Sequence, residues 1–174
     1  MAEAKKIMTE IVIDDGSVEV PIKNKRGEQI GVFYFRPTDM GIVDRYNKTI
    51  GKFDDITAPL ESVNINPDGT ADENEQAEVD AMHEAEKRLY EACDYMFGGN
   101  MSEAFFGSMH PFSPVNGRFY CEHALEAVGI YIGAQFDRET EKISKRVERY
   151  THGYAARTGK HKDGKKGLAG SLLA

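Results

Sequence analysis

Cysteine is scarce in this chain, since Cys93 and Cys121 are the only two among 174 residues. Both fall within apolar patterns of helical spacing, where a cysteine behaves as a small buried hydrophobic residue. A chain of this length can bury about two-thirds of its unfolded surface, so its fold does not depend on disulfides or a structural metal. We therefore predict a globular protein with two reduced cysteines in its core.

Long apolar segments are also missing. The sequence has no run of about 18 apolar residues, so it contains no candidate transmembrane helix. Its first residues lack the apolar core of about 7–15 residues that characterises a signal peptide. Together with the reduced cysteines, these features predict a cytoplasmic protein without a membrane partner.

Catalytic and cofactor-binding motifs are not found either. The five histidines have no partner at zinc-site spacing, and there is no nucleophile elbow, P-loop or dinucleotide-binding glycine motif. Cys121 and His123 lie two positions apart in a predicted helix, which points them to different sides. We therefore expect no enzymatic activity, no cofactor and no metal site.

One loop has features of a calcium site. Residues 64–75 place oxygen-bearing side chains at most ligand positions of an EF-hand loop, with Gly69 at the sharp turn. Asn64 is neutral where an aspartate is usual, and Ala71 stands where paired loops carry a β-branched residue. A solvated loop leading into an acidic helix explains the same residues, so a calcium-binding module stays an alternative.

The residue pattern predicts an α+β fold that is mainly α. Two β-rich runs at 18–22 and 29–35 flank a polar, glycine-containing connection and predict an N-terminal β-hairpin. Residues 11–13 predict a further short strand. Both faces of the second run are largely apolar, which predicts a strand covered on both sides.

A helical bundle is expected after the hairpin. Thr38 or Asp39 is placed to cap the first helix. Its apolar stripe consists of Met40, Val43, Tyr46, Ile50 and Phe53. Residues 57–70 are typical of a loop, and an acidic helix follows over about 72–97. The apolar stripe of that helix consists of Val79, Met82, Ala85, Leu89, Cys93 and Met96, and Gly98-Gly99 ends it.

A long C-terminal helix completes the expected fold. A short helical turn at 102–107 and a rigid turn at 110–117 lead into it. Its apolar stripe consists of Cys121, Leu125, Val128, Ile132, Phe136, Ile143, Val147 and Tyr150. About thirty helical residues would span roughly 45 Å, which exceeds the need of a small core. We therefore predict one domain over 1–155, followed by a disordered basic tail over 156–174.

The distal half of this helix is the predicted partner-binding surface. The residues expected to form it are Ile143, Val147, Tyr150, Tyr154, Arg146 and Arg149. Residues 54–94 carry 13 acids against Lys87 and Arg88, whereas residues 138–166 carry ten Lys/Arg against four acids. Such polarity favours head-to-tail self-association or an oppositely charged partner, although two solvated helix faces and a basic tail would give the same counts. The tail has no interleaved aromatic residues, so we do not expect nucleic acid as a partner.

Several segments in order carry a family resemblance. They are FYFRPTD at 33–39, RYN at 45–47, YMFGGN at 95–100, FFG at 105–107 and PFSPVNGRFYCE at 111–122. Over about residues 18–155 the chain resembles small tail-morphogenesis proteins of phages and prophages of Gram-positive bacteria, and among these the tail assembly chaperones. This resemblance carries no catalytic residues with it.

The resemblance implies a role in viral morphogenesis. Such chaperones coat the long helical tape-measure protein in the cytoplasm of the bacterial host and help tail tube protein polymerise around it. The sequence-based hypothesis is therefore a non-enzymatic, oligomeric tail assembly chaperone that binds the tape-measure protein. The alternative is a structural tail or connector subunit that stays in the phage particle.

Overall fold

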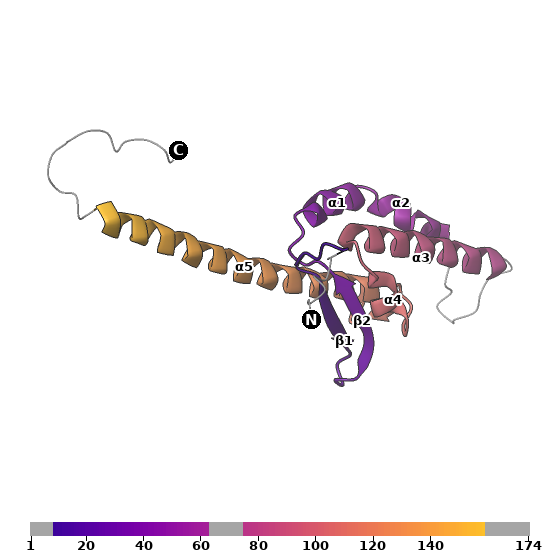
Figure 1. Ribbon diagram of the computed structural model, residues 1–174. Coiled ribbons are helices and arrows are strands. Elements are labelled where there is room, and N and C mark those ends of the chain that lie inside the picture. The colour runs from indigo at the N-terminus through magenta and orange to yellow at the C-terminus, as the bar shows by residue number, and fades with distance from the viewer. Residues whose placement is uncertain (1–8, 63–74, 159–174) are drawn as a thin grey trace. The chain divides into compact units, whose positions relative to one another are not determined.

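The computed structural model describes residues 9–62 and 75–158, and only the backbone of residues 153–158. The chain divides into two compact units, Met1–Gly133 and Ala134–Ala174, where the sequence predicted one domain through residue 155. The elements follow in the order β1 (Val18–Lys23), β2 (Gln29–Phe35), α1 (Gly41–Ile50), α2 (Phe53–Thr57), the 3₁₀ helix η1 (Ala58–Ser62), α3 (Glu75–Phe97), α4 (Met101–Phe106), β3 (Pro114–Val115), β4 (Arg118–Phe119) and α5 (Tyr120–Thr158) (Figure 1). The predicted mainly helical α+β fold, with its N-terminal hairpin and long C-terminal helix, is confirmed.

The N-terminal hairpin pairs β1 with β2 in antiparallel register, with Val20 opposite Phe33. Its turn is closed by Asn24, whose side-chain oxygen accepts hydrogen bonds from the backbone N–H groups of Arg26 and Glu28. Gly27 supplies a positive φ of 83° there, a conformation that glycine adopts without strain.

The predicted strand at residues 11–13 is wrong. Ile11, Val12 and Ile13 have no strand pairing among the described residues and are 97%, 83% and 78% exposed. A strand needs a neighbour for its backbone groups, and β-branched composition alone does not supply one.

The outer edge of β2 is closed by one side chain. The Asn100 amide accepts a hydrogen bond from the Tyr34 N–H at 2.8 Å and donates one to the Val32 carbonyl at 3.0 Å. The backbone after α3 can come this close because residue 99 is a glycine. A Cβ atom at this position would overlap the Tyr34 carbonyl. On β2 itself, a Cβ atom at Gly31 would overlap the carbonyl of Ala104 in α4.

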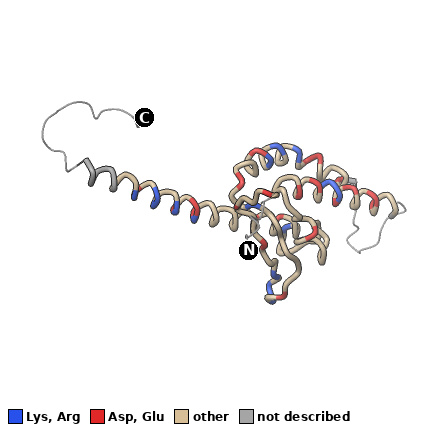
Figure 2. Tube along the Cα trace, in the orientation of Figure 1, with Lys and Arg blue, Asp and Glu red and all other residues tan. Residues whose placement is uncertain are grey.

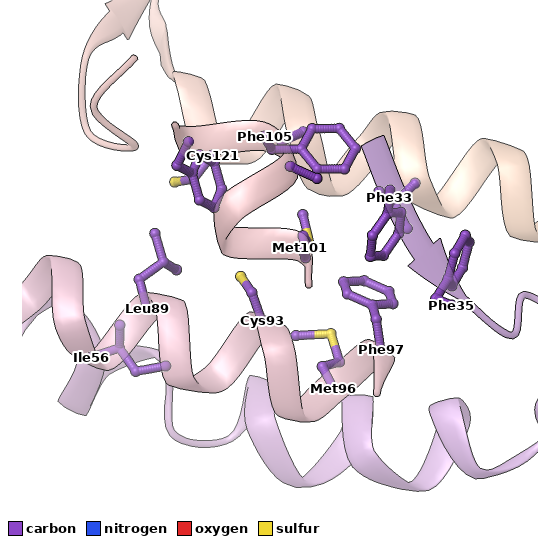
Figure 3. Packing of buried hydrophobic residues seen from close by; sticks show 14 of the residues in the cluster. Phe33, Phe35, Ile56, Leu89, Cys93, Met96, Phe97, Met101, Phe105 and Cys121 are labelled. Carbon is purple, nitrogen blue, oxygen red and sulfur yellow. The ribbon is translucent and has the colours of Figure 1, made fainter. Parts of the chain in front are cut away.

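Only one face of β2 is fully covered, which corrects the expectation of burial on both faces. Phe33 and Phe35 are buried, whereas Tyr34 on the other face is 51% exposed. The two buried rings stack at 4.1 Å between centroids, and Phe33 meets Phe97 and Phe105 edge to face. These ring contacts fix the hairpin on the helical core (Figure 3).

The helical core is centred on α3. Its apolar stripe is buried as predicted at Ala85, Leu89, Cys93 and Met96, while Val79 near its start stays 42% exposed. Figure 3 shows Leu89 and Cys93 pointing towards Met101 of α4 and Cys121 of α5. From α5 the buried residues are Cys121, Ala124 and Val128. The predicted helix stop is also present, because Gly98 has a φ of 63° and its N–H donates to the Asp94 carbonyl.

A two-residue turn places the start of α5. Asn116 and Gly117 have φ values of 49° and 78° and join β3 to β4 in a tight hairpin, where the sequence predicted only a rigid turn over 110–117. The side chain of Glu122 then accepts a hydrogen bond from the Phe119 N–H at 2.7 Å, which satisfies a donor ahead of the helix. α5 continues to Thr158, so residues 156–158 of the predicted tail are helical in backbone, and residues 159–174 lie outside the described part.

The orientation of α1 differs from the prediction. Its apolar stripe faces solvent, and its buried residues are Ile42 and Thr49. The predicted loop at 57–70 is corrected in part, since η1 occupies Ala58–Ser62 and residues 63–70 are outside the described ranges. The predicted cap at Thr38 or Asp39 is wrong, because Met40 is the N-cap residue and makes no capping hydrogen bond with its side chain. The Asp39 carboxylate, one residue earlier, accepts a hydrogen bond from the Gly41 N–H at 2.9 Å.

Candidate partner-binding surfaces

The second unit presents an apolar strip on α5. The α5 strip consists of Ile143, Val147 and Tyr150, which are 52%, 51% and 73% exposed. Spacings of four and three residues place them on one face of the helix. Tyr154 continues this spacing, but its side chain lies outside the described residues. Exposed apolar side chains that form a contiguous strip are typical of an interface.

Charged side chains flank the α5 strip. Lys142 contacts Glu139 and Lys145 contacts Glu141, each at 2.6 Å. Within residues 9–62 and 75–152, Arg146 has no ion-pair partner. Exposed pairs of this kind contribute little to stability, so they define a solvated rim around the apolar strip.

The charge of the second unit is nearly balanced in its described part. Residues 134–152 contain five Lys/Arg and four Asp/Glu, and Figure 2 shows residues of both signs along α5. The excess of positive charge counted through residue 166 therefore depends on residues beyond those described. The red residues along α3 in Figure 2 are the described part of the predicted acidic segment.

A second apolar surface, which the sequence did not predict as a site, lies on α1. The α1 stripe is defined by Met40, Val43, Tyr46 and Ile50, which are 70%, 52%, 45% and 51% exposed. The sequence assigned these residues to the core. One residue in the sequence argues against that assignment. Arg45 lies three and four residues from Ile42 and Thr49, on the face of α1 opposite the stripe, and this is the face that is buried.

Arg45 holds α1 in this orientation. Its Nε donates a hydrogen bond to the Met96 carbonyl near the end of α3 at 3.0 Å, and its Nη2 donates to Asp39 Oδ2 at 2.9 Å. The hydrogen bond from Arg45 is the main reason why the pKa of the Asp39 carboxyl lies below its ordinary value. The buried Thr49 hydroxyl donates to the Arg45 carbonyl at 2.8 Å. Polar contacts thus accompany the packing of Ile42 at this interface.

An apolar groove of about 480 Å³ runs between α1, α3 and the first part of α5, all within the first unit. Its lining includes Tyr46, Ile50, Met96 and Leu125. Arg118 also lines it and contacts Glu126 at 2.7 Å, which holds the pKa of that carboxyl below its ordinary value. The groove continues from the rim formed by the α1 stripe, so the two make one apolar surface.

The cysteine and histidine candidates are placed as structural residues. Cys93 and Cys121 are buried and free, and burial raises the pKa of their thiols to about 12 and about 11. A nucleophilic cysteine needs the opposite shift, because the thiolate is the reactive form. His123 forms a hydrogen bond through Nε2 with the Val115 carbonyl at 2.9 Å, so its ring supports β3.

A polar cluster surrounds Glu86 on α3. The Tyr90 hydroxyl donates to Glu86 at 2.6 Å, and His83 and His110 approach the same carboxylate at 3.4 and 3.8 Å. Burial, followed by the hydrogen bond to Glu86, raises the pKa of Tyr90. Across the described ranges no group of three or more His, Cys, Asp or Glu side chains is placed to hold a metal ion. The calcium-loop residues 64–74 fall outside these ranges.

The described helices include none with the length and apolarity needed to cross a membrane. Comparison of the chain with protein-family models, curated proteins and solved structures finds no match.

Proposed function

We propose that this chain is a non-enzymatic phage tail assembly chaperone that binds the tape-measure protein and assists tail tube polymerisation in the host cytoplasm. The observation that supports the proposal is the α5 strip, where Ile143, Val147 and Tyr150 are half-exposed or more on one helix face. The sequence resemblance supplies the identity of the partner.

The α5 strip suits an extended helical partner. An amphipathic helix docks through apolar residues at positions i, i+3, i+4 and i+7, which match the spacing of the strip. The charged residues beside it, including Arg146 and Arg149, add orientation and keep the surface solvated when no partner is present. Binding of many copies along one long partner makes a weak single contact sufficient.

The test is the double substitution Ile143→Asp with Val147→Asp in the full chain. Both side chains are about half exposed, so the variant should keep the helical circular-dichroism signal and the melting temperature of the wild type. It should fail to keep a co-expressed tape-measure fragment in the soluble fraction. Full solubilisation by this variant would refute the proposed contact.

A matched control carries the same added charge on the opposite helix face. Ala134→Asp with His152→Asp also adds two carboxylates at exposed positions of the second unit. This control should solubilise the tape-measure fragment as the wild type does. Its failure would show that charge on α5, and not the apolar strip, governs binding.

Analysis of purified phage particles separates the chaperone from a structural tail or connector subunit. A chaperone leaves the assembled tail, so mass spectrometry of the particles should find no stoichiometric amount of this chain. A fixed number of copies per particle would support the structural subunit instead.

A further inference from the structure

Four residues of the second unit, apolar except for Thr140, form a seam with coiled-coil spacing. Phe136, Thr140, Ile143 and Val147 follow one another at intervals of four, three and four residues, which is the a/d pattern of paired helices. Phe136 is half-buried, and the other three are exposed. A seam of this kind is completed by a second helix, because its apolar side chains otherwise face water.

Opposite charges border the seam on one side. Glu139 and Arg146 are seven residues apart and therefore lie on the same flank. Glu139 contacts Lys142, whereas Arg146 is without an ion pair in the described ranges. A partner helix should therefore offer a carboxylate to Arg146.

We propose that the partner is a second copy of this chain, whose α5 packs antiparallel along the seam. Phe136 then lies opposite Val147 of the second copy, and Thr140 lies opposite Ile143. In this register Glu139 meets Arg146 of the second copy, and the twofold axis repeats the same contact with the roles exchanged. Each copy thus supplies the carboxylate that the Arg146 of the other lacks.

Charge selects this register from its alternatives. Moving one helix by seven residues keeps a and d positions facing one another but places either Arg146 against Arg146 or Glu139 against Glu139, and both arrangements repel. A parallel pair brings Glu139 beside Ser144 and Arg146 beside Thr151, which offer no opposite charge. Only the antiparallel register satisfies both charges.

The proposed pair is closed, because the same surface is used on both copies. It differs from the head-to-tail association of a basic helix with a neighbour's acidic α3, which would continue without limit. It involves only copies of this chain, but it shares Ile143 and Val147 with the surface proposed for the tape-measure protein, so the two contacts would exclude each other at these residues.

The first test reverses the two charges in the full chain and follows self-association by sedimentation equilibrium at low salt. Glu139→Arg or Arg146→Glu alone should each raise the dissociation constant about tenfold, because symmetry counts each repulsion twice. The combined variant Glu139→Arg with Arg146→Glu should restore wild-type association, as should an equimolar mixture of the two single variants. Both positions are exposed, so circular dichroism should show no loss of helix.

The charge experiment has outcomes that overturn the proposal. Head-to-tail association with α3 would be weakened by Arg146→Glu but strengthened or unchanged by Glu139→Arg. Failure of the combined variant to restore association would also exclude the reciprocal contact. A wild-type chain that stays monomeric at millimolar concentration would exclude any pair.

The second test traps the register with engineered cysteines. One copy carries Thr140→Cys and the other carries Ile143→Cys, which the proposed register places opposite each other. Disulfide-linked dimers should form only when the two variants are mixed under mild oxidation. The wild type is the control, since its own Cys93 and Cys121 are buried. Dimers of the Ile143→Cys copy alone would indicate a parallel pair, and no dimer in the mixture would refute this register.

Discussion

α1 and α3 carry the same kind of apolar periodicity, yet they use it in opposite ways. The stripe of α3 is buried, with Leu89 and Cys93 only 2% and 1% exposed. The stripe of α1 faces solvent, and Arg45 and Thr49 occupy its inner face with their hydrogen bonds satisfied. Periodicity therefore indicates that a helix has an apolar face, but polar contacts decide whether that face meets the core.

The largest loss of unfolding free energy should come from a substitution of Leu89 in the α3 stripe. Leu89→Ala removes a buried side chain from the centre of the α3 stripe, and the resulting cavity should lower the free energy of unfolding by about 3 kcal/mol. Urea denaturation measures this loss directly. A loss below about 1 kcal/mol would mean that α3 is no better packed than α1.

Substitution of Arg45 should give the second-largest loss of unfolding free energy. Arg45→Ala removes the side-chain donor to the Met96 carbonyl and to Asp39 Oδ2, which should lower the free energy of unfolding by about 2 kcal/mol. Lys48→Ala is the matched control, because its pair with Asp44 is exposed and screened by solvent, so its loss should change the same quantity much less. Equal losses in the two variants would show that Arg45 does not anchor α1.

The Arg45–Asp39 contact should also appear as a pH effect. The folded state lowers the pKa of Asp39 below its ordinary value of 3.8, so ionised Asp39 stabilises the fold above about pH 4. This contribution is lost as the pH falls through the lowered pKa. The difference in unfolding free energy between the wild type and Asp39→Asn should therefore shrink in acid. An NMR titration should also show the Asp39 pKa rising towards 3.8 in Arg45→Ala, and an unchanged pKa would contradict the assigned cause.

The smallest change in unfolding free energy is expected from a substitution in the α1 stripe. Val43→Ser replaces a side chain that is 52% exposed, so it should alter the free energy of unfolding by about 0.5 kcal/mol or less. Thermal unfolding at low protein concentration provides the measurement. A loss as large as that of Leu89→Ala would show that the stripe is covered in the folded chain.

Local signals predicted most of the fold. The hairpin, the α3 stripe, the stop at Gly98 and the turn at Asn116-Gly117 each depend on residues close together in sequence. The position of α1 depends instead on Arg45 reaching Met96, 51 residues away. The edge of β2 likewise depends on Asn100, which bonds to residues 66 and 68 positions earlier. Single-sequence periodicity contains no information on such pairs.

The candidate surfaces were predictable to different degrees. The exposure of Ile143, Val147 and Tyr150 agrees with their position beyond the expected core, because helical spacing continues where core residues end. The apolar groove was not predictable, since residues of α1, α2, α3, β4 and α5 come together to form it. The α1 stripe was visible in the sequence as a pattern, but its direction was assigned to the wrong side.

The side-chain contact of Asn100 with β2 has a consequence for how copies of this chain meet. The amide stands in for a third strand, so it occupies backbone groups of Val32 and Tyr34 that another chain would need for sheet extension. The backbone N–H and C=O groups of Val32 and Tyr34 point away from β1. Pro21 is paired with Val32, so its backbone nitrogen points away from β2, towards the free edge of β1. This nitrogen carries no hydrogen and cannot donate to an added strand. Both margins of the hairpin thus resist strand addition. The hairpin is in this way protected from edge-to-edge pairing with another copy of the chain.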